Sequence, residues 1–183
     1  RKNKKRNLAL SINEGINLSK YDYVIWMDAD FQHPPKYIDK FIDFSKEYDA
    51  VIASRFLKES KRYFNTNEFK KEINENQSYF YNKVCRSLFF KDVTDYTSGF
   101  VCLKKDFFKD YSLSGYYGDY FVDLIIELKK NKRRIIEIPF KDSERASGLS
   151  KTLVTINLKY LYTCFRYFVT LIKSYLKYKF SFG

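Results

Sequence analysis

Two acidic residues, separated by a single residue, come directly after an apolar run. Asp28 and Asp30 come after residues 23–27, and Gln32 lies one alternation further along. In extended backbone, residues two apart point the same way, so both carboxylates would emerge beyond the carboxyl edge of a sheet, where α/β sheets bind ligands. Two carboxylates and an amide oxygen suit Mg²⁺ or Mn²⁺, which keeps its other positions for water and diphosphate oxygens. An isolated pair of acids more often caps a loop, so the surrounding pattern has to decide.

Helix and strand patterns alternate along the chain and would position this pair. Apolar residues at helical spacing predict helices, and short apolar runs predict buried strands of a parallel sheet. A polar loop from residue 57 grades into one of the helices. The expected helices cover residues 4–18, 35–44, about 76–90 and 117–130, and the expected strands cover residues 23–27, 49–54, 97–103 and 134–138. This order indicates an α/β fold with a mostly parallel sheet flanked by helices.

Composition limits the classes of function. With 183 residues, 45% hydrophobic and 31% charged, the chain has the size and apolar content of one folded domain and is not a disordered segment. Its net charge of +12 predicts attraction to polyanions, which include nucleic acids, anionic lipids and phosphate-bearing substrates. Three widely spaced cysteines argue against a disulfide framework or a zinc knuckle. Because His33 is the only histidine, we exclude a histidine-based metal cluster and interpret His33 either as a support for residues that bind ligand or as a structural residue.

The last segment, residues 152–183, is basic and aromatic and contains no acidic residue. Polar residues recur there at intervals of three and four, which predicts a helix with a narrow polar stripe on an otherwise apolar surface. No uncharged run approaches the ~18 residues that a spanning helix needs. The segment therefore either lies in a membrane interface or is buried against a further part of the protein, and both interpretations stay open. We take residues 1–151 as a partial catalytic domain and residues 152–183 as this amphipathic helix.

Five further segments join the acidic pair in an ordered series. They are residues 53–56 (Ala-Ser-Arg-Phe), 78 and 82 (Ser and Asn), 95–100 (Asp-Tyr-Thr-Ser-Gly-Phe), 137–139 (Glu-Ile-Pro) and 145–151 (Arg-Ala-Ser-Gly-Leu-Ser-Lys). Together with Asp-Ala-Asp-Phe-Gln-His-Pro-Pro at residues 28–35, the series resembles family 2 glycosyltransferases, and among them the dolichol-phosphate mannosyltransferases and their bacterial polyprenyl-phosphate relatives. The resemblance implies a GT-A-like, Rossmann-related fold whose first nucleotide-binding unit is missing, so that the chain is N-terminally truncated.

The resemblance also implies roles for individual residues. Asp28, Asp30 and Gln32 would hold Mg²⁺ or Mn²⁺ with the donor diphosphate. Catalysis would depend on Asp30 together with Arg145 and Lys151, whose positive charges offset the charge of the leaving diphosphate. The substrate-binding residues would be Arg55, Ser78, Asp95, Ser98 and Ser150, with Arg55 and Ser78 on the phosphate of the lipid acceptor.

The expected function is metal-dependent, inverting transfer of a mannose- or glucose-like sugar from a nucleoside diphosphate to a polyprenyl or dolichyl phosphate. The partners would be a nucleotide sugar, the acceptor lipid and a membrane surface, with a peripheral location on the cytoplasmic face and no nucleic acid. Three alternatives remain: transfer to a sugar hydroxyl in cell-surface polysaccharide synthesis, a basic nucleic-acid-binding module, and an inactive fragment. A hydroxyl acceptor would need a general base, for which Asp95, Asp119 and Asp123 are candidates, whereas a phosphate acceptor is already an anion.

Overall fold

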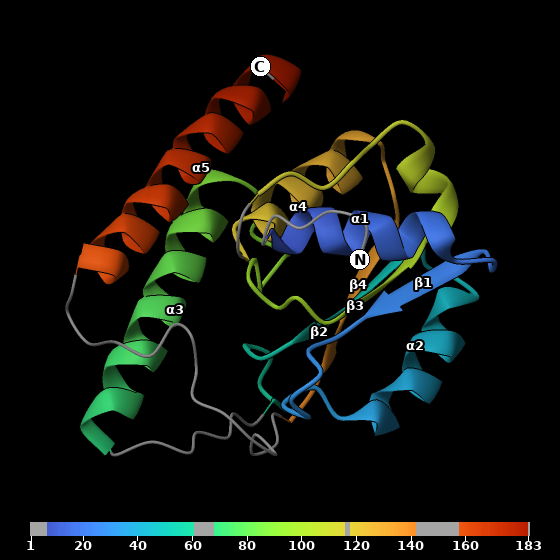
Figure 1. Cartoon of the computed structure of the whole chain (residues 1–183), viewed down its shortest axis with the longest axis horizontal. Helices are drawn as coiled ribbons and strands as arrows, with labels where there is room; N and C mark the ends of the chain where they lie inside the picture. Colours follow the sequence, from blue (N-terminus) through green and yellow to red (C-terminus); the bar gives the residue numbers. More distant parts are fainter. Residues whose placement is uncertain (1–6, 61–67, 116–117, 142–157, 183) are drawn as a thin grey trace.

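A computed structural model of the protein describes residues 7–60, 68–115, 118–141 and 158–182 (Figure 1). For residues 68–77, 158–161, 163 and 181–182 it describes the backbone alone. Each helix and strand expected from the sequence has a counterpart, and most ends are shifted by a few residues. The helix expected from about residue 76 begins at Glu68, within the segment expected to be a loop. In chain order the elements are α1 (Leu8–Leu18), β1 (Tyr23–Trp26), η1 (Pro35–Tyr37), α2 (Ile38–Ser45), β2 (Ala50–Ser54), α3 (Glu68–Leu88), β3 (Val101–Lys104), η2 (Lys105–Lys109), α4 (Tyr120–Lys130), β4 (Ile135–Pro139) and α5 (Leu158–Phe182).

The described strands form one mixed sheet in the order β1-β3-β2-β4 (Figure 1). β2 and β4 are parallel, whereas β3 runs antiparallel to both β1 and β2. The α/β class is confirmed, but the expected mostly parallel arrangement holds for only one of these three pairings. An apolar run predicts that a strand is buried and carries no information about its direction. Cys102 of β3 therefore pairs with Ile25 and with Val51 in an orientation that the sequence did not indicate.

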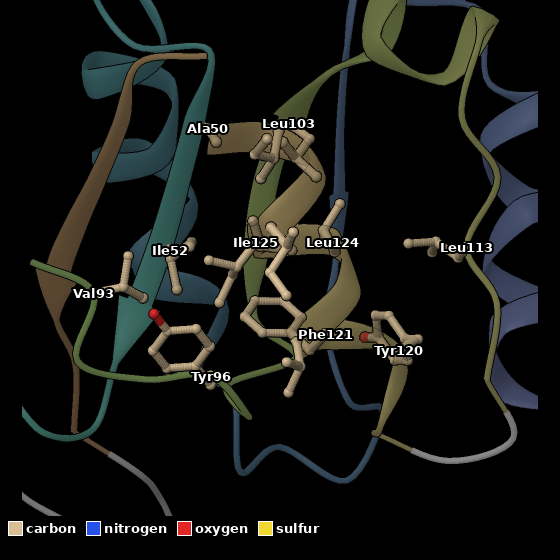
Figure 2. Close-up of a cluster of buried hydrophobic side chains, with 14 of the residues drawn as sticks. Ala50, Ile52, Val93, Tyr96, Leu103, Leu113, Tyr120, Phe121, Leu124 and Ile125 are labelled. Atoms are coloured by element: carbon tan, nitrogen blue, oxygen red, sulfur yellow. The ribbon is translucent and has the colours of Figure 1, made fainter. Parts of the chain in front are cut away.

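Helices cover both faces of the sheet. Ala50 and Ile52 of β2 belong to the larger buried cluster, with α4 and α1, while Val51 and Ala53 point to the opposite face and join Phe41 of α2. This is the alternation expected of a strand buried on both sides. Figure 2 shows Phe121, Leu124 and Ile125 of α4 against β2 and β3. Each large apolar side chain buried in this way stabilises the fold by about 1.5–3 kcal/mol.

α5 lies beside α3 and α4 (Figure 1) and turns part of its polar stripe toward α4. Thr170 Oγ1 donates to Asp119 Oδ2 at 3.1 Å, and Lys177 Nζ donates to Asp123 Oδ1 at 3.0 Å. Lys177 Nζ also lies 2.9 Å from Glu127 Oε1. Three acids spaced four residues apart on α4 thus meet polar groups of α5, because residues at that spacing share one side of a helix.

Another side of α5 exposes large apolar side chains at intervals of three and four residues. They are Tyr162, Phe165, Phe168, Ile172, Leu176 and Phe180. This exposed row is called the outer face of α5 below. No helix in the described part of the chain combines the length and the apolar character needed to cross a bilayer.

Candidate active site

Residues 28–32, called the acidic segment below, begin just after β1 ends and form a turn. Asp28 is exposed and Asp30 is half-buried in a turn, and Phe31 adopts a φ of 65°. Asp30 Oδ1 accepts a hydrogen bond from the Gln32 backbone N–H at 3.1 Å. The extended backbone assumed from the sequence therefore stops before Asp30, because the aspartate side chain bonds its own backbone and stabilises a turn.

The buried side chain of His33 supports this turn. The imidazole is buried, lies parallel to the Phe100 ring at a centroid distance of 4.7 Å and meets the edge of Phe140 at 5.7 Å. Its Nδ1 accepts a hydrogen bond from the Asp28 backbone N–H at 2.9 Å. Burial lowers the pKa of His33, which agrees with a neutral ring whose Nδ1 is an acceptor. The structural role expected for His33 is thus seen in its contacts.

Four charged groups from three separate segments lie close enough to His33 to act on its charge. The carboxylates of Asp28, Asp30 and Asp95 each act to raise the pKa of His33, and the guanidinium of Arg55 acts to lower it, although burial outweighs them. The fold therefore brings the acidic segment together with the Arg55–Asp95 pair. Sequence spacing alone did not indicate this proximity.

Arg55 and Asp95 form a bidentate ion pair. Arg55 Nε donates to Asp95 Oδ2 and Arg55 Nη2 donates to Asp95 Oδ1, both at 2.8 Å. Arg55 Nη2 also donates to Thr97 Oγ1 at 2.8 Å, and the guanidinium carbon lies 5.6 Å from the centre of the Phe56 ring. Burial opposes the charge on Asp95, but the Arg55 guanidinium and hydrogen bonds from Arg55 and Thr97 outweigh it, so the pKa of Asp95 is lowered.

The contacts of Asp95 are those of a residue that supports Arg55. Its side chain has no exposed surface, and both carboxylate oxygens accept hydrogen bonds from Arg55 and Thr97. In this arrangement Asp95 holds Arg55, and the paired arginine remains partly exposed. Contact of Asp95 with substrate stays a prediction.

Ser98 and Ser78 occupy different surroundings. Ser98 is buried, and its hydroxyl donates to the Ala53 carbonyl, which joins the loop before β3 to β2. Such a side chain supports the loop, and a contact between Ser98 and substrate stays a prediction. Ser78 is half-buried on α3, one helical turn before Asn82. Asn82 Nδ2 donates to Thr97 Oγ1 at 3.1 Å, so this part of α3 lies near the arginine.

Several polar residues of this site had no assigned role in the sequence. Asn82 Oδ1 accepts from the Tyr96 backbone N–H at 2.6 Å, and Glu137 accepts from the Thr94 and Asp95 backbone N–H groups. Glu137 interrupts the apolar strand Ile-Ile-Glu-Ile-Pro. An acid within such a strand is a usable signal, because a buried carboxylate requires donors. Arg145, Ser150 and Lys151, by contrast, lie outside the described residues.

The acidic segment supplies oxygen ligands of the type that a hard divalent cation prefers, but only part of the number it needs. Within the described residues, no group of three or more His, Cys, Asp or Glu side chains could hold a metal ion by itself. Asp28 and Asp30 offer two carboxylates, and Gln32 offers an amide oxygen. This set suits an ion such as Mg²⁺ or Mn²⁺ that takes its remaining ligands from water and a bound diphosphate.

The sequence model of glycosyl transferase family 2 matches residues 1–112, which include the acidic segment, Arg55 and Asp95. The chain is 28% identical over 167 residues to the dolichol-phosphate mannosyltransferase of Pyrococcus furiosus, covering 91% of this chain and 46% of that protein. It is 29% identical over 135 residues to the undecaprenyl-phosphate mannosyltransferase of Micrococcus luteus, covering 72% of this chain and 53% of that protein. The chain thus spans about half the length of these curated relatives.

A solved structure shares the fold at low sequence identity. It is glucosyl-3-phosphoglycerate synthase from Mycobacterium tuberculosis in complex with Mn²⁺, uridine diphosphate and glucosyl-3-phosphoglycerate. The TM-score is 0.57 at 12% identity, and the match covers 93% of this chain and 55% of that chain. This likeness supports the GT-A-like fold expected from the sequence.

Proposed function

Because the chain belongs to glycosyl transferase family 2, we propose that it is the catalytic part of an enzyme that transfers a mannose- or glucose-like sugar from a nucleoside diphosphate to a polyprenyl phosphate. Asp28, Asp30 and Gln32 hold Mg²⁺ or Mn²⁺, and the ion offsets negative charge on the diphosphate of the donor. Two polyprenyl-phosphate mannosyltransferases among the relatives support this choice of acceptor.

The observation that carries the proposal is that the acidic segment and the Arg55 guanidinium both lie close enough to His33 to act on its charge. The acids provide the ligands for a cation that binds one phosphate group, and the guanidinium provides a planar donor for a second. With the donor diphosphate at Asp28 and Asp30, Arg55 orients the acceptor phosphate, and a phosphate oxygen attacks the anomeric carbon with inversion. Arg145 and Lys151 add positive charge beside the leaving diphosphate.

The candidate general bases favour a phosphate acceptor over a sugar hydroxyl. Asp95 is fully buried in its ion pair, and its pKa is lowered, which makes it a weak base. Asp123 is bound to Lys177 and to the Tyr111 hydroxyl, and the buried Asp119 accepts from Thr170. A hydroxyl nucleophile would require one of them to accept a proton, whereas an ionised phosphate does not.

The outer face of α5 supports a peripheral position on a membrane. Its exposed aromatic and aliphatic side chains are accompanied by Arg166 and Lys173, and residues 146–183 contain six basic residues and no acidic one. Aromatic rings beside basic side chains suit the interface of a bilayer with anionic lipids. A second copy of the same face would bring like charges together, which disfavours a symmetric dimer there. We propose that the enzyme lies on the cytoplasmic face of this membrane and uses nucleotide sugars there as donors.

The test is transfer by the full-length protein. Polyprenyl phosphate is incubated with a panel of radiolabelled nucleotide sugars, with and without Mg²⁺ or Mn²⁺, and the products are extracted with organic solvent. We expect label in the organic phase only when the divalent ion is present. Asp30→Asn should abolish this transfer, whereas Asp43→Asn, a change of an exposed acid on α2, should retain it. Label in water-soluble glycan would replace the lipid acceptor by a sugar hydroxyl, and full activity of Asp30→Asn would refute the metal site.

A further inference from the structure

Glu137 lies behind the Arg55–Asp95 pair and binds the segment that carries Asp95. Its Oε1 accepts from the Asp95 backbone N–H at 2.9 Å. Its Oε2 accepts from the Thr94 backbone N–H at 2.7 Å and from Thr94 Oγ1 at 2.8 Å. Three donors therefore converge on one carboxylate, which only accepts when ionised.

The Thr94 hydroxyl extends this contact to the other side of Arg55. Burial raises the pKa of Glu137, whereas the hydrogen bonds from Asp95 and Thr94 favour its charged form. When Glu137 is ionised, the Thr94 hydroxyl donates to it, and the 2.6 Å bond between Ser54 Oγ and Thr94 Oγ1 is then donated by Ser54. Ser54 Oγ then accepts from the Phe56 backbone N–H at 3.1 Å. The direction of every bond in this chain follows from the acceptor-only carboxylate at its end.

Two series of hydrogen bonds lead from Glu137 to the surroundings of Arg55. One runs through the backbone of Asp95, whose side chain grips the guanidinium. The other runs through Thr94 and Ser54 to Phe56, so that Ser54 and Phe56 hold the backbone on either side of the arginine. We propose that Glu137 is a positioning residue, which sets the orientation of the Arg55 guanidinium toward the phosphate of the acceptor without touching it. This inference rests on the proposed function for the identity of that phosphate.

The hydrogen bonds to Glu137 depend on the carboxylate having two acceptor oxygens as well as on the size of the side chain. Glutamine has nearly the same size, but one of the two oxygens becomes an NH₂ group. That group would face either the Asp95 backbone N–H or the Thr94 backbone N–H, and neither N–H can pair with another donor. Glu137→Gln thus leaves at least one of these two backbone N–H groups without its acceptor, while the volume in β4 is almost unchanged.

Kinetics of the full-length enzyme test this role. Glu137→Gln is compared with Thr94→Val, which removes only the hydroxyl route, and with Glu47→Gln, an exposed glutamate after α2. We expect kcat/KM for polyprenyl phosphate to fall by about tenfold to a hundredfold in Glu137→Gln, as for a misplaced contact group, with the KM for the nucleotide sugar unchanged. Thr94→Val should show a smaller loss of the same kind and Glu47→Gln none.

A double variant separates positioning of Arg55 from a general structural effect. If Glu137 acts through Arg55, adding Glu137→Gln to Arg55→Gln should cost little further activity, because the group being positioned is already gone. Multiplicative losses in the double variant would overturn the proposal, as would a KM for the nucleotide sugar that rises as much as that for the lipid.

A spectroscopic measurement keeps the inference testable without transfer activity. The Arg55 Nε–H donates to a buried carboxylate, so its proton–nitrogen signal, assigned with Arg55→Lys, should be sharp and protected from exchange with water. Glu137→Gln should remove that protection, and Glu47→Gln should retain it. An unchanged signal in Glu137→Gln overturns the positioning role. Absence of sugar transfer to polyprenyl phosphate by the wild type overturns the proposed function alone.

Discussion

The carboxylate of Asp95 and the guanidinium of Arg55 meet through two parallel hydrogen bonds of 2.8 Å, and Asp95 has no exposed surface. A buried carboxylate of this kind orients a cation that is itself accessible, because the pair leaves 16% of the arginine side chain exposed. The arginine therefore presents its charge at a fixed angle beside the acidic segment. Planar recognition of a phosphate depends on such an angle.

Replacing Asp95 should damage the fold as well as the site. Asp95→Asn leaves the Arg55 guanidinium facing an amide, and removal of one partner of a buried pair typically costs about 3 kcal/mol. We expect that decrease in the free energy of unfolding, measured by urea denaturation. Asp92→Asn serves as the control, since Asp92 is 67% exposed in its pair with Lys129. Equal stability of the two variants would contradict the importance of the buried pair.

The same pair predicts a dependence of stability on pH. The pKa of Asp95 is lower in the folded chain than the value of about 3.9 expected after unfolding. The unfolded state therefore binds more protons in that range, so the stabilisation is present above about pH 4 and is lost as the pH falls through the folded pKa. Urea midpoints of the wild type should fall more steeply below about pH 4 than those of Asp95→Asn. Parallel curves would show that Asp95 is not the group responsible.

Lys177 should hold α5 against α4. It is paired with both Asp123 and Glu127, and Lys177→Met would leave the two acids without their shared cation. Because the Lys177 side chain is 39% exposed, water screens the pair, and we expect a loss of about 1 kcal/mol. Hydrogen exchange of α5 should become faster, while Lys173→Met, at an exposed position of the same helix, should have no such effect. Similar exchange in both variants would mean that other contacts hold α5.

The outer face of α5 should govern binding to lipid vesicles. Phe165 and Phe168 are 61% and 58% exposed, so changing both to serine should leave the thermal midpoint almost unaltered. Affinity for vesicles that contain anionic lipids should fall by at least about tenfold, since each ring stabilises binding by about 1.5–3 kcal/mol when it leaves water. Co-sedimentation measures this change, with Phe44→Ser on α2 as the matched control. Undiminished binding would remove α5 from the membrane contact.

Apolar periodicity in the sequence was sufficient to predict most described helices and strands approximately, but neither η2 nor the first part of α3 was predicted. The stripe that begins at Tyr37 appears as α2, and the run that precedes Asp28 appears as β1, ending at Trp26. Such patterns are reliable because the period of the buried side chains depends on local backbone geometry alone. The ordered motifs likewise identified the family from the types and order of residues, without any knowledge of distances.

Only the tertiary structure decided which side chains meet. Strand direction depends on partners distant in the sequence, so β3 runs antiparallel where a parallel strand was expected. Part of the polar stripe of α5 faces the acids of α4, although a lone amphipathic helix would turn the whole stripe to water. Asp28, Arg55 and Asp95 all lie close enough to His33 to act on its charge, and Asp95 becomes a support for Arg55 because burial and hydrogen-bond partners, which a sequence does not contain, determine what a carboxylate does.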